Sequence, residues 1–229
     1  VSYTLLIMLS SYSVCRAMVM PASFLVVLFY AIYLVVRNGV ISYQKASGLA
    51  MFSGIVIFCF YSFIRLKEML PVEEYGYDAI FFILLILCFA WGGDTCAYFA
   101  GRAFGKHKLC PVVSPKKTVE GAIGGVLGTM VFGVLVTVIY SIAADRMEEF
   151  TRSNIGVSMY VIIALLACVA AVLGIYGDLF ASVVKRQCGI KDYGTIFPGH
   201  GGILDRFDST MLVAPLTELL ILLIPFAVK

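Results

Sequence analysis

Long apolar stretches dominate this chain of 229 residues and restrict the folds open to it. Several windows hold more than about 18 largely apolar residues, the length that a helix needs to cross a bilayer. Hydrophobic residues make up 61% of the chain and charged residues only 14%. A soluble domain carries roughly 25% charged residues. We therefore predict an all-α, polytopic integral membrane protein.

The apolar stretches predict about six to seven transmembrane helices, because each is long enough to span the hydrocarbon or nearly so. The chain begins at Val1 rather than Met, so we expect an N-terminal piece to be missing and residues 3–14 to be a shortened span. The other predicted spans are residues 17–36, 46–64, 78–98, 119–142, 158–184 and 207–228.

Lysine and arginine are distributed unevenly between the loops, and this predicts the orientation. Most of them fall on the side that holds loops 99–118 and 185–206, whereas loops 65–77 and 143–157 hold few. Cytoplasmic loops are enriched in these residues. We therefore expect a polar site at the cytoplasmic interface of a membrane, with the bacterial inner (plasma) membrane as the expected location.

Small and aromatic residues are interpreted as structural. Gly121, Gly124, Gly125 and Gly128 form overlapping small-xxx-small patterns, which predict close packing against a neighbouring helix. Trp91, Tyr98 and Phe99 are assigned to an aromatic belt at the membrane interface rather than to base stacking. No nucleic-acid partner is expected, and the oligomeric state is left open, with a homodimer as one option.

The run 182–208 is the most charged part of an otherwise apolar region. Charged side chains are costly beside hydrocarbon, so such a cluster at a membrane edge indicates a functional site. A glycine-rich turn over residues 198–202 lies within it. The charged members are Lys185, Arg186, Lys191, Asp192, His200, Asp205, Arg206 and Asp208.

Four carboxylates from three segments are expected to converge near the cytoplasmic interface. Asp94 and Asp178 lie near the cytoplasmic ends of their spans, and Asp205 and Asp208 share one helix face at the start of the last span. Carboxylates beside glycine-rich backbone suit Mg²⁺, which prefers oxygen ligands and substrate phosphates. The alternative is that each acid pairs with a nearby lysine or arginine.

A second motif, Ser-Pro-Lys-Lys-Thr-Val-Glu-Gly at residues 114–121, is predicted to begin a helix. Ser114 would be the N-cap and Pro115 the first helical residue. Lys116 and Lys117 at a helix N-terminus would form an anion site for a polyphosphate. The alternative is a basic membrane anchor with ordinary capping. His200 is expected to contact a phosphate, or else only to shape its turn.

These motifs closely resemble those of the phosphatidate cytidylyltransferase family, also called CDP-diacylglycerol synthases. The upstream family patterns are matched by residues 94–98 (Asp-Thr-Cys-Ala-Tyr) and 114–121. The family signature is matched, with its spacing, by Ser182, Lys185, Arg186, Lys191, Asp192, the Pro-Gly-His-Gly-Gly turn at 198–202, Asp205, Arg206, Phe207 and Asp208.

The resemblance implies a Mg²⁺-dependent nucleotidyltransferase of phospholipid biosynthesis, embedded among membrane lipids. CTP and phosphatidate would give CDP-diacylglycerol and pyrophosphate, with one or two divalent cations and Mn²⁺ as a substitute. Residues 1–89 would be N-terminal transmembrane helices, and residues 90–229 a catalytic region continuous with them in one membrane domain. Two alternatives stay open: a CTP-dependent lipid kinase, and an ion-coupled transporter.

The resemblance also assigns roles to individual residues. The expected metal ligands are Asp178, Asp205 and Asp208, and these three count as catalytic together with Lys185 and Arg186. The expected substrate-binding residues are Asp94, Ser114, Lys116, Lys117, Ser182, Lys191, His200, Gly201 and Arg206.

Overall fold

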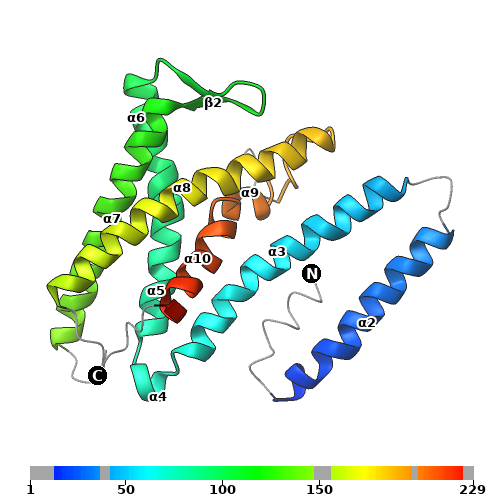
Figure 1. The fold of residues 1–229 in the computed structure, drawn as a ribbon, viewed down its shortest axis with the longest axis horizontal. Helices are drawn as coiled ribbons and strands as arrows, with labels where there is room; N and C mark the ends of the chain where they lie inside the picture. Colours follow the sequence, from blue (N-terminus) through cyan, green and yellow to red (C-terminus); the bar gives the residue numbers. More distant parts are fainter. Residues whose placement is uncertain (1–12, 37–41, 147–155, 197–200, 224–229) are drawn as a thin grey trace. The chain divides into compact units, whose positions relative to one another are not determined.

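The computed structural model describes residues 13–36, 42–146, 156–196 and 201–223, and these form two compact units, residues 1–68 and 69–229 (Figure 1). The predicted division after residue 89 falls inside a continuous helical run and stays a prediction. The elements are α2 (Ser13–Val36), α3 (Tyr43–Met69), α4 (Val72–Tyr75), α5 (Asp78–Leu87), η1 (Cys88–Gly92), α6 (Gly93–Phe104), β1 (Lys108–Cys110), β2 (Ser114–Thr118), α7 (Val119–Arg146), α8 (Val157–Gln187), α9 (Leu204–Phe207) and α10 (Thr210–Leu223).

The predicted all-α membrane fold is confirmed. Four helices are long and apolar enough to cross a membrane: Gln44–Met69, Asp78–Phe104, Val119–Ala144 and Val157–Gln187. Phe24–Tyr33 and Thr210–Leu223 are shorter apolar helices. Many large apolar side chains on these helices point outward, as lipid-facing positions require because the solvent there is hydrocarbon. The predicted total of six to seven spans stays a prediction.

In the first unit, α2 and α3 present mainly apolar surface. Phe24, Val27 and Phe29 of α2 are exposed, as are Met51 and Phe58 of α3. Pro21 lies inside α2.

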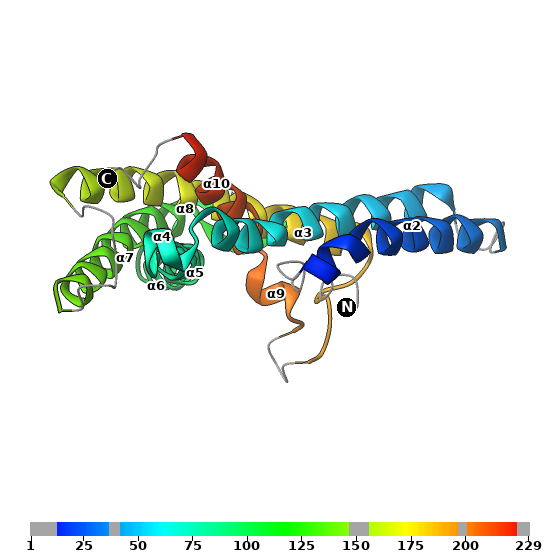
Figure 2. The same ribbon diagram turned by 90° about the horizontal axis from the view of Figure 1, so that it is seen from below.

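In the second unit, α7 packs against α6 and α8, and α10 packs against α8 (Figures 1 and 2). The glycines predicted to allow close helix packing do so between α6 and α7. A Cβ atom at Gly121 would lie 2.8 Å from the carbonyl oxygen of Ala97, and one at Gly125 would lie 3.0 Å from the Ala97 Cβ. Larger residues at these positions would push the two helices apart. The glycines therefore bring α6, which carries Asp94, against α7.

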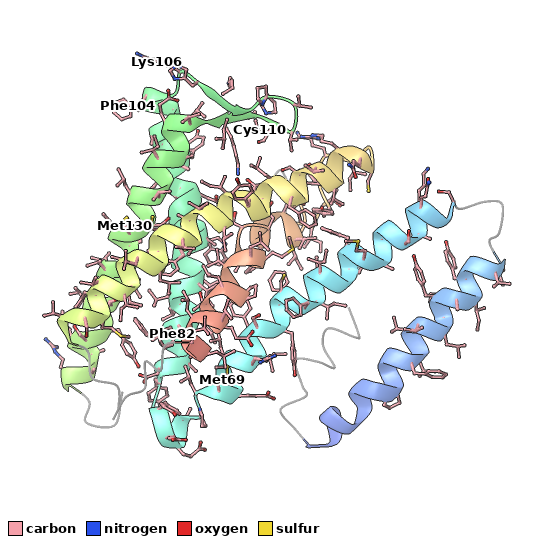
Figure 3. All side chains as sticks on the ribbon, viewed as in Figure 1. Met69, Phe82, Phe104, Lys106, Cys110 and Met130 are labelled. Carbon is pink, nitrogen blue, oxygen red and sulfur yellow. The ribbon has the colours of Figure 1, made fainter. Side chains whose placement is uncertain are left out.

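The core of the second unit lies between α5, η1, α8 and α10. Phe81, Leu85 and Phe89 are almost fully buried there, as are Ile163 and Met211. Figure 3 places Phe82 of α5 far from Phe104 and Lys106, which lie at the end of the unit that carries the hairpin. The apolar core and the polar end are thus separated along the helices.

A two-stranded antiparallel hairpin, β1 and β2, connects α6 to α7, and the predicted helix start at Ser114 is therefore wrong. Ser114 pairs with Cys110, and the helix begins five residues later at Val119. Thr118 is the residue that caps it, since its Oγ1 accepts the N–H of Gly121 at 3.1 Å. A Ser-Pro pair is compatible with a helix start or with an edge strand, and pairing with β1 decides between them.

Candidate active site

A cavity of about 500 Å³ lies between α6, α7, α8 and the hairpin. One set of lining residues is charged or polar and another is apolar, so the cavity can hold a molecule with both kinds of surface. The polar lining includes Asp94, Arg102, Ser114, Lys116, Lys117 and Asp178, and the apolar lining includes Phe89, Ala90, Ala97, Ala122, Ala171 and Ile175.

The charged lining residues form what we call the cavity cluster: Asp94, Arg102, Lys116, Lys117 and Asp178. Lys117 reaches from β2 and forms an ion pair with Asp178 of α8. The Oδ1 of Asp178 lies 3.3 Å from the Ser182 hydroxyl, one helical turn further along. Three elements, α6, β2 and α8, thus contribute charges to one cavity.

A second group of residues, the buried cluster, consists of Lys185, Tyr193, Asp205 and Asp208. The Nζ of Lys185 lies 2.8 Å from Asp205 Oδ1 and 3.9 Å from Asp208 Oδ2. The same ammonium lies 5.3 Å from the centre of the Tyr193 ring, within cation–π range. Because the lysine side chain is only 10% exposed, these partners together compensate for the loss of water around its charge.

Asp205 connects Tyr193 and Gly202 to Lys185 of α8. Its Oδ2 accepts the backbone N–H groups of Tyr193 and Gly202, both at 2.8 Å. Burial alone would raise the pKa of Asp205, but the hydrogen bonds from Lys185 and these two N–H groups lower it below its usual range. Gly201 has a φ of +84°, and a Cβ there would lie 2.9 Å from Asp205 Oδ2. Glycine is therefore required at this turn.

Asp208 connects the two clusters electrostatically. It is buried and is repelled by Asp178 and Asp94, whereas Lys185 attracts it. Asp94 is linked to the same segment, because the Ser209 hydroxyl donates to its Oδ2 at 2.7 Å. The predicted convergence of Asp94, Asp178 and Asp208 is thus present as mutual electrostatic repulsion. Asp205 is close by but is bound mainly by Lys185 and the loop.

Trp91 holds the Asp205–Asp208 segment against the η1 turn. Its indole Nε1 donates to the Arg206 carbonyl at 3.0 Å, and its ring lies 5.5 Å from that of Phe207. Trp91 lies in the π-helical turn, and such turns are frequent at functional sites. The sequence predicted only an interfacial aromatic residue here. Nothing in the chain signals a π-helical turn, so this contact was missed.

Glu120 fixes the base of the hairpin. Its carboxylate accepts the backbone N–H groups of Lys106 and His107, at 3.0 Å and 3.2 Å to Oε2. Its Oε1 lies 2.6 Å from His107 Nδ1, although that imidazole is 78% exposed. Glu120 thus determines how the strand that carries Lys116 and Lys117 leaves α7.

Most of the predicted site residues fall into three groups by position. Asp94, Ser114, Lys116, Lys117 and Asp178 line the cavity. Ser182, Lys185 and Asp208 are buried beside it, together with the Asp205 side chain. Arg186 and Lys191 are exposed, as is Arg206, while Gly201 forms the turn and His200 lies outside the described residues.

Arg102 is a cavity residue that the sequence reasoning missed. It lies eight residues after Asp94 on α6, close to two helical turns, so both line the cavity. Its Nη1 lies 3.5 Å from the Tyr98 hydroxyl. The spacing Asp94, Tyr98, Arg102 was a usable signal, because residues four apart share a helix face.

The carboxylates are oxygen ligands of the kind that a divalent cation binds, and substrate phosphates would complete the coordination of such a cation. Within the described ranges, no three His, Cys, Asp or Glu side chains already form a cation cage. Mg²⁺, however, usually takes one or two carboxylates together with phosphate oxygens. Asp178 and Asp208 repel each other, and each already has an ammonium nearby, from Lys117 and Lys185. A cation would relieve that repulsion, and the oxygen donors are of the kind Mg²⁺ prefers.

Comparison with known proteins connects this geometry with a family. A sequence profile described as "Cytidylyltransferase family" matches residues 1–224. The chain belongs to this family. A relative from Bacillus subtilis, named phosphatidate cytidylyltransferase, is 31% identical over 204 residues, which are 89% of this chain and 68% of the relative.

Staphylococcal relatives of the same name are more similar over a shorter region. Those from Staphylococcus haemolyticus and Staphylococcus epidermidis are 40% and 43% identical over 145 residues, which are 63% of this chain and 50% of each relative. The aligned parts of this cytidylyltransferase-family chain thus span about half the length of these relatives. The chain thus combines membership of the cytidylyltransferase family with helices that are long and apolar enough to cross a membrane.

Proposed function

We propose that the chain is a phosphatidate cytidylyltransferase, which converts CTP and phosphatidate into CDP-diacylglycerol and pyrophosphate. The observation that carries this proposal is the mixed lining of the cavity. Lysine, arginine and aspartate side chains border it together with phenylalanine, alanine and isoleucine. A nucleoside triphosphate needs charged and polar surface for its phosphates. A phospholipid substrate needs that surface for its phosphate and apolar surface for its acyl chains.

The basic residues suit the phosphates of both substrates. Lys116, Lys117 and Arg102 line the same cavity from β2 and α6. A lysine binds phosphate as a point charge, whereas an arginine can donate two parallel hydrogen bonds. We assign the two lysines to the triphosphate of CTP and Arg102 to either phosphate. Arg186, Lys191 and Arg206 are exposed and would attract the incoming nucleotide by charge.

The reaction is a displacement at the α-phosphorus of CTP. A phosphatidate oxygen forms a bond to that phosphorus, the bond to the α,β-bridging oxygen breaks, and pyrophosphate leaves. The attacking oxygen is already an anion at neutral pH, so no strong general base is required. The protein then acts mainly by positioning the two phosphates and stabilising the charge that develops.

Asp178 and Asp208 are the residues that we propose to hold Mg²⁺, with Asp205 as the third predicted ligand. Bound Mg²⁺ would neutralise phosphate charge and orient the attacking and leaving oxygens. Asp205 contributes differently in the described chain, because both of its oxygens already accept hydrogen bonds. Asp94 would position the Asp208 segment through Ser209.

We further propose that the cavity opens towards the cytoplasm, where CTP is available. Single cysteines at Lys108, in β1, and at Glu74, in α4, would test this in a background without native cysteines. An impermeant thiol reagent added to intact cells should label position 74 and spare position 108. Labelling of both after permeabilisation is the control. The reverse pattern on intact cells would contradict the proposed orientation.

Labelled CTP tests the reaction itself. The purified protein is incubated with phosphatidate and CTP labelled at either the α- or the γ-phosphate. We expect α-label in the lipid product and γ-label in pyrophosphate. Transfer of γ-label to a lipid would identify a lipid kinase instead. If folded protein supplied with Mg²⁺ transferred label to lipid from neither α-labelled nor γ-labelled CTP, the result would contradict the proposal.

A further inference from the structure

Lys117 and Lys185 both neutralise carboxylates, but they are held very differently. Lys185 belongs to α8, is 8% exposed as a residue, and has two aspartates and an aromatic ring around its ammonium. Lys117 extends from the short strand β2. Among the described residues, its one ion pair is with Asp178. Its partner lines the cavity, whereas Asp205 and Asp208 do not.

The ammonium of Lys117 lies beside Asp178, in the acidic part of the cavity lining. Its Nζ is buried, although 23% of the side chain is exposed. Asp178 also repels Asp94 and Asp208; Lys117 opposes this repulsion at Asp94, whereas Lys185 opposes it at Asp208. The flexible four-carbon side chain of Lys117 can change partners by rotation alone, without movement of β2.

We infer that Lys117 takes the place of the divalent cation at Asp178 in the cation-free protein, and that cation binding releases its ammonium to the triphosphate. This inference rests on the proposed function. The cation and the lysine would compete for one carboxylate. The lysine becomes available to CTP only after the cation has replaced it. Cation loading and nucleotide binding are thereby coupled through one side chain.

The coupling predicts an effect that a simple phosphate-binding lysine would not have. If the ammonium competes with the cation, its removal must tighten cation binding in the absence of any nucleotide. Couplings between two sites commonly change affinity by about 5- to 150-fold. We expect roughly tenfold here, because Asp178 is partly accessible to water. A lysine that only contacts CTP would leave the cation affinity unchanged.

Lys116 provides a matched control. It precedes Lys117 on β2 and lines the same cavity, but it is exposed and has no ion pair among the described residues. Lys116→Met therefore removes the same charge from nearly the same place. Any general electrostatic effect of losing one positive charge will appear in this variant too. The difference between Lys116→Met and Lys117→Met isolates the contact with Asp178.

The experiment measures Mn²⁺ binding to the full purified protein in detergent, without nucleotide, from the electron paramagnetic resonance signal of free Mn²⁺. We expect Lys117→Met and Lys117→Gln to bind Mn²⁺ roughly tenfold more tightly than wild type. Lys116→Met should differ by less than about twofold, because an exposed charge is screened by salt. Lys117→Arg, which keeps the charge, should resemble wild type.

Several results would overturn the inference. Unchanged or weaker Mn²⁺ binding in both neutral Lys117 variants, with melting temperatures close to that of wild type, contradicts the competition. Equal tightening in Lys116→Met would assign the effect to general electrostatics. No Mn²⁺ binding in any variant would also refute the competition. The α-label experiment on wild type would then decide separately whether the proposed reaction stands.

Discussion

The cavity cluster and the buried cluster contain the same kinds of residue but differ in what holds them. In the buried cluster, Lys185 and Asp205 are fixed by each other, by two backbone N–H groups and by Tyr193. In the cavity cluster, Lys117 and Asp178 mainly hold each other, beside open space. The first arrangement suits a rigid support and the second suits charges that exchange partners with a substrate. Substitutions in the two clusters should therefore fail in different ways.

The largest effect is expected from Lys185→Met, which should reduce both folding and activity. It leaves Asp205 and Asp208 buried without their ammonium, and breaking a buried pair costs about 3 to 5 kcal/mol. Thermal unfolding in detergent should show a large fall in melting temperature. A variant as stable as wild type would show that the buried cluster is not a structural support.

Lys117→Ala should reduce activity without destabilising the fold. The pair with Asp178 is partly exposed, so its contribution to stability is small. Loss of a charged hydrogen bond to the triphosphate should lower kcat/KM for CTP about tenfold or more. Lys116→Ala should act in the same direction but more weakly. A rise confined to the KM for phosphatidate would place the hairpin at the lipid instead.

Glu120→Gln tests whether the hairpin needs a fixed base. The amide can accept fewer hydrogen bonds than the carboxylate that now binds Lys106 and His107. We expect a several-fold rise in the KM for CTP, because Lys116 and Lys117 lose their fixed approach to the cavity. Glu120→Asp, which keeps a carboxylate, should raise the KM for CTP less than Glu120→Gln does. If kcat fell instead and the KM values for both substrates stayed constant, Glu120 would have a role other than positioning.

The smallest effect is expected from Trp91→Phe, which keeps an aromatic ring beside Phe207 but loses the indole N–H. The hydrogen bond to the Arg206 carbonyl should contribute about 1 kcal/mol. Activity should fall by a few-fold, with a small decrease in melting temperature. Complete loss of activity would mean that Trp91 contacts a substrate.

The sequence predicted the membrane fold well, because it depends on a local signal, whereas the joint role of the four acids stays a prediction. Apolar length determines the spans, and Asp94 and Asp178 each follow a glycine in the sequence. The hairpin could not be predicted, since Ser114 and Pro115 also satisfy the rules for a helix start and only pairing with Cys110 excludes it. The partners of Asp205 could not be predicted either, because they are backbone N–H groups of Tyr193 and Gly202, whose positions no side-chain pattern in the sequence indicates.

The most direct test of the account is transfer of α-label from CTP to lipid by Asp178→Asn and Asp208→Asn. Each substitution keeps the side-chain shape and removes one charge where the two clusters meet. Glu73→Gln, an exposed acid in α4, is the matched control. We predict loss of transfer in both aspartate variants, with the protein still folded in detergent, and wild-type transfer in the control. Near-wild-type transfer by either aspartate variant at low Mg²⁺ would contradict the proposed catalytic site.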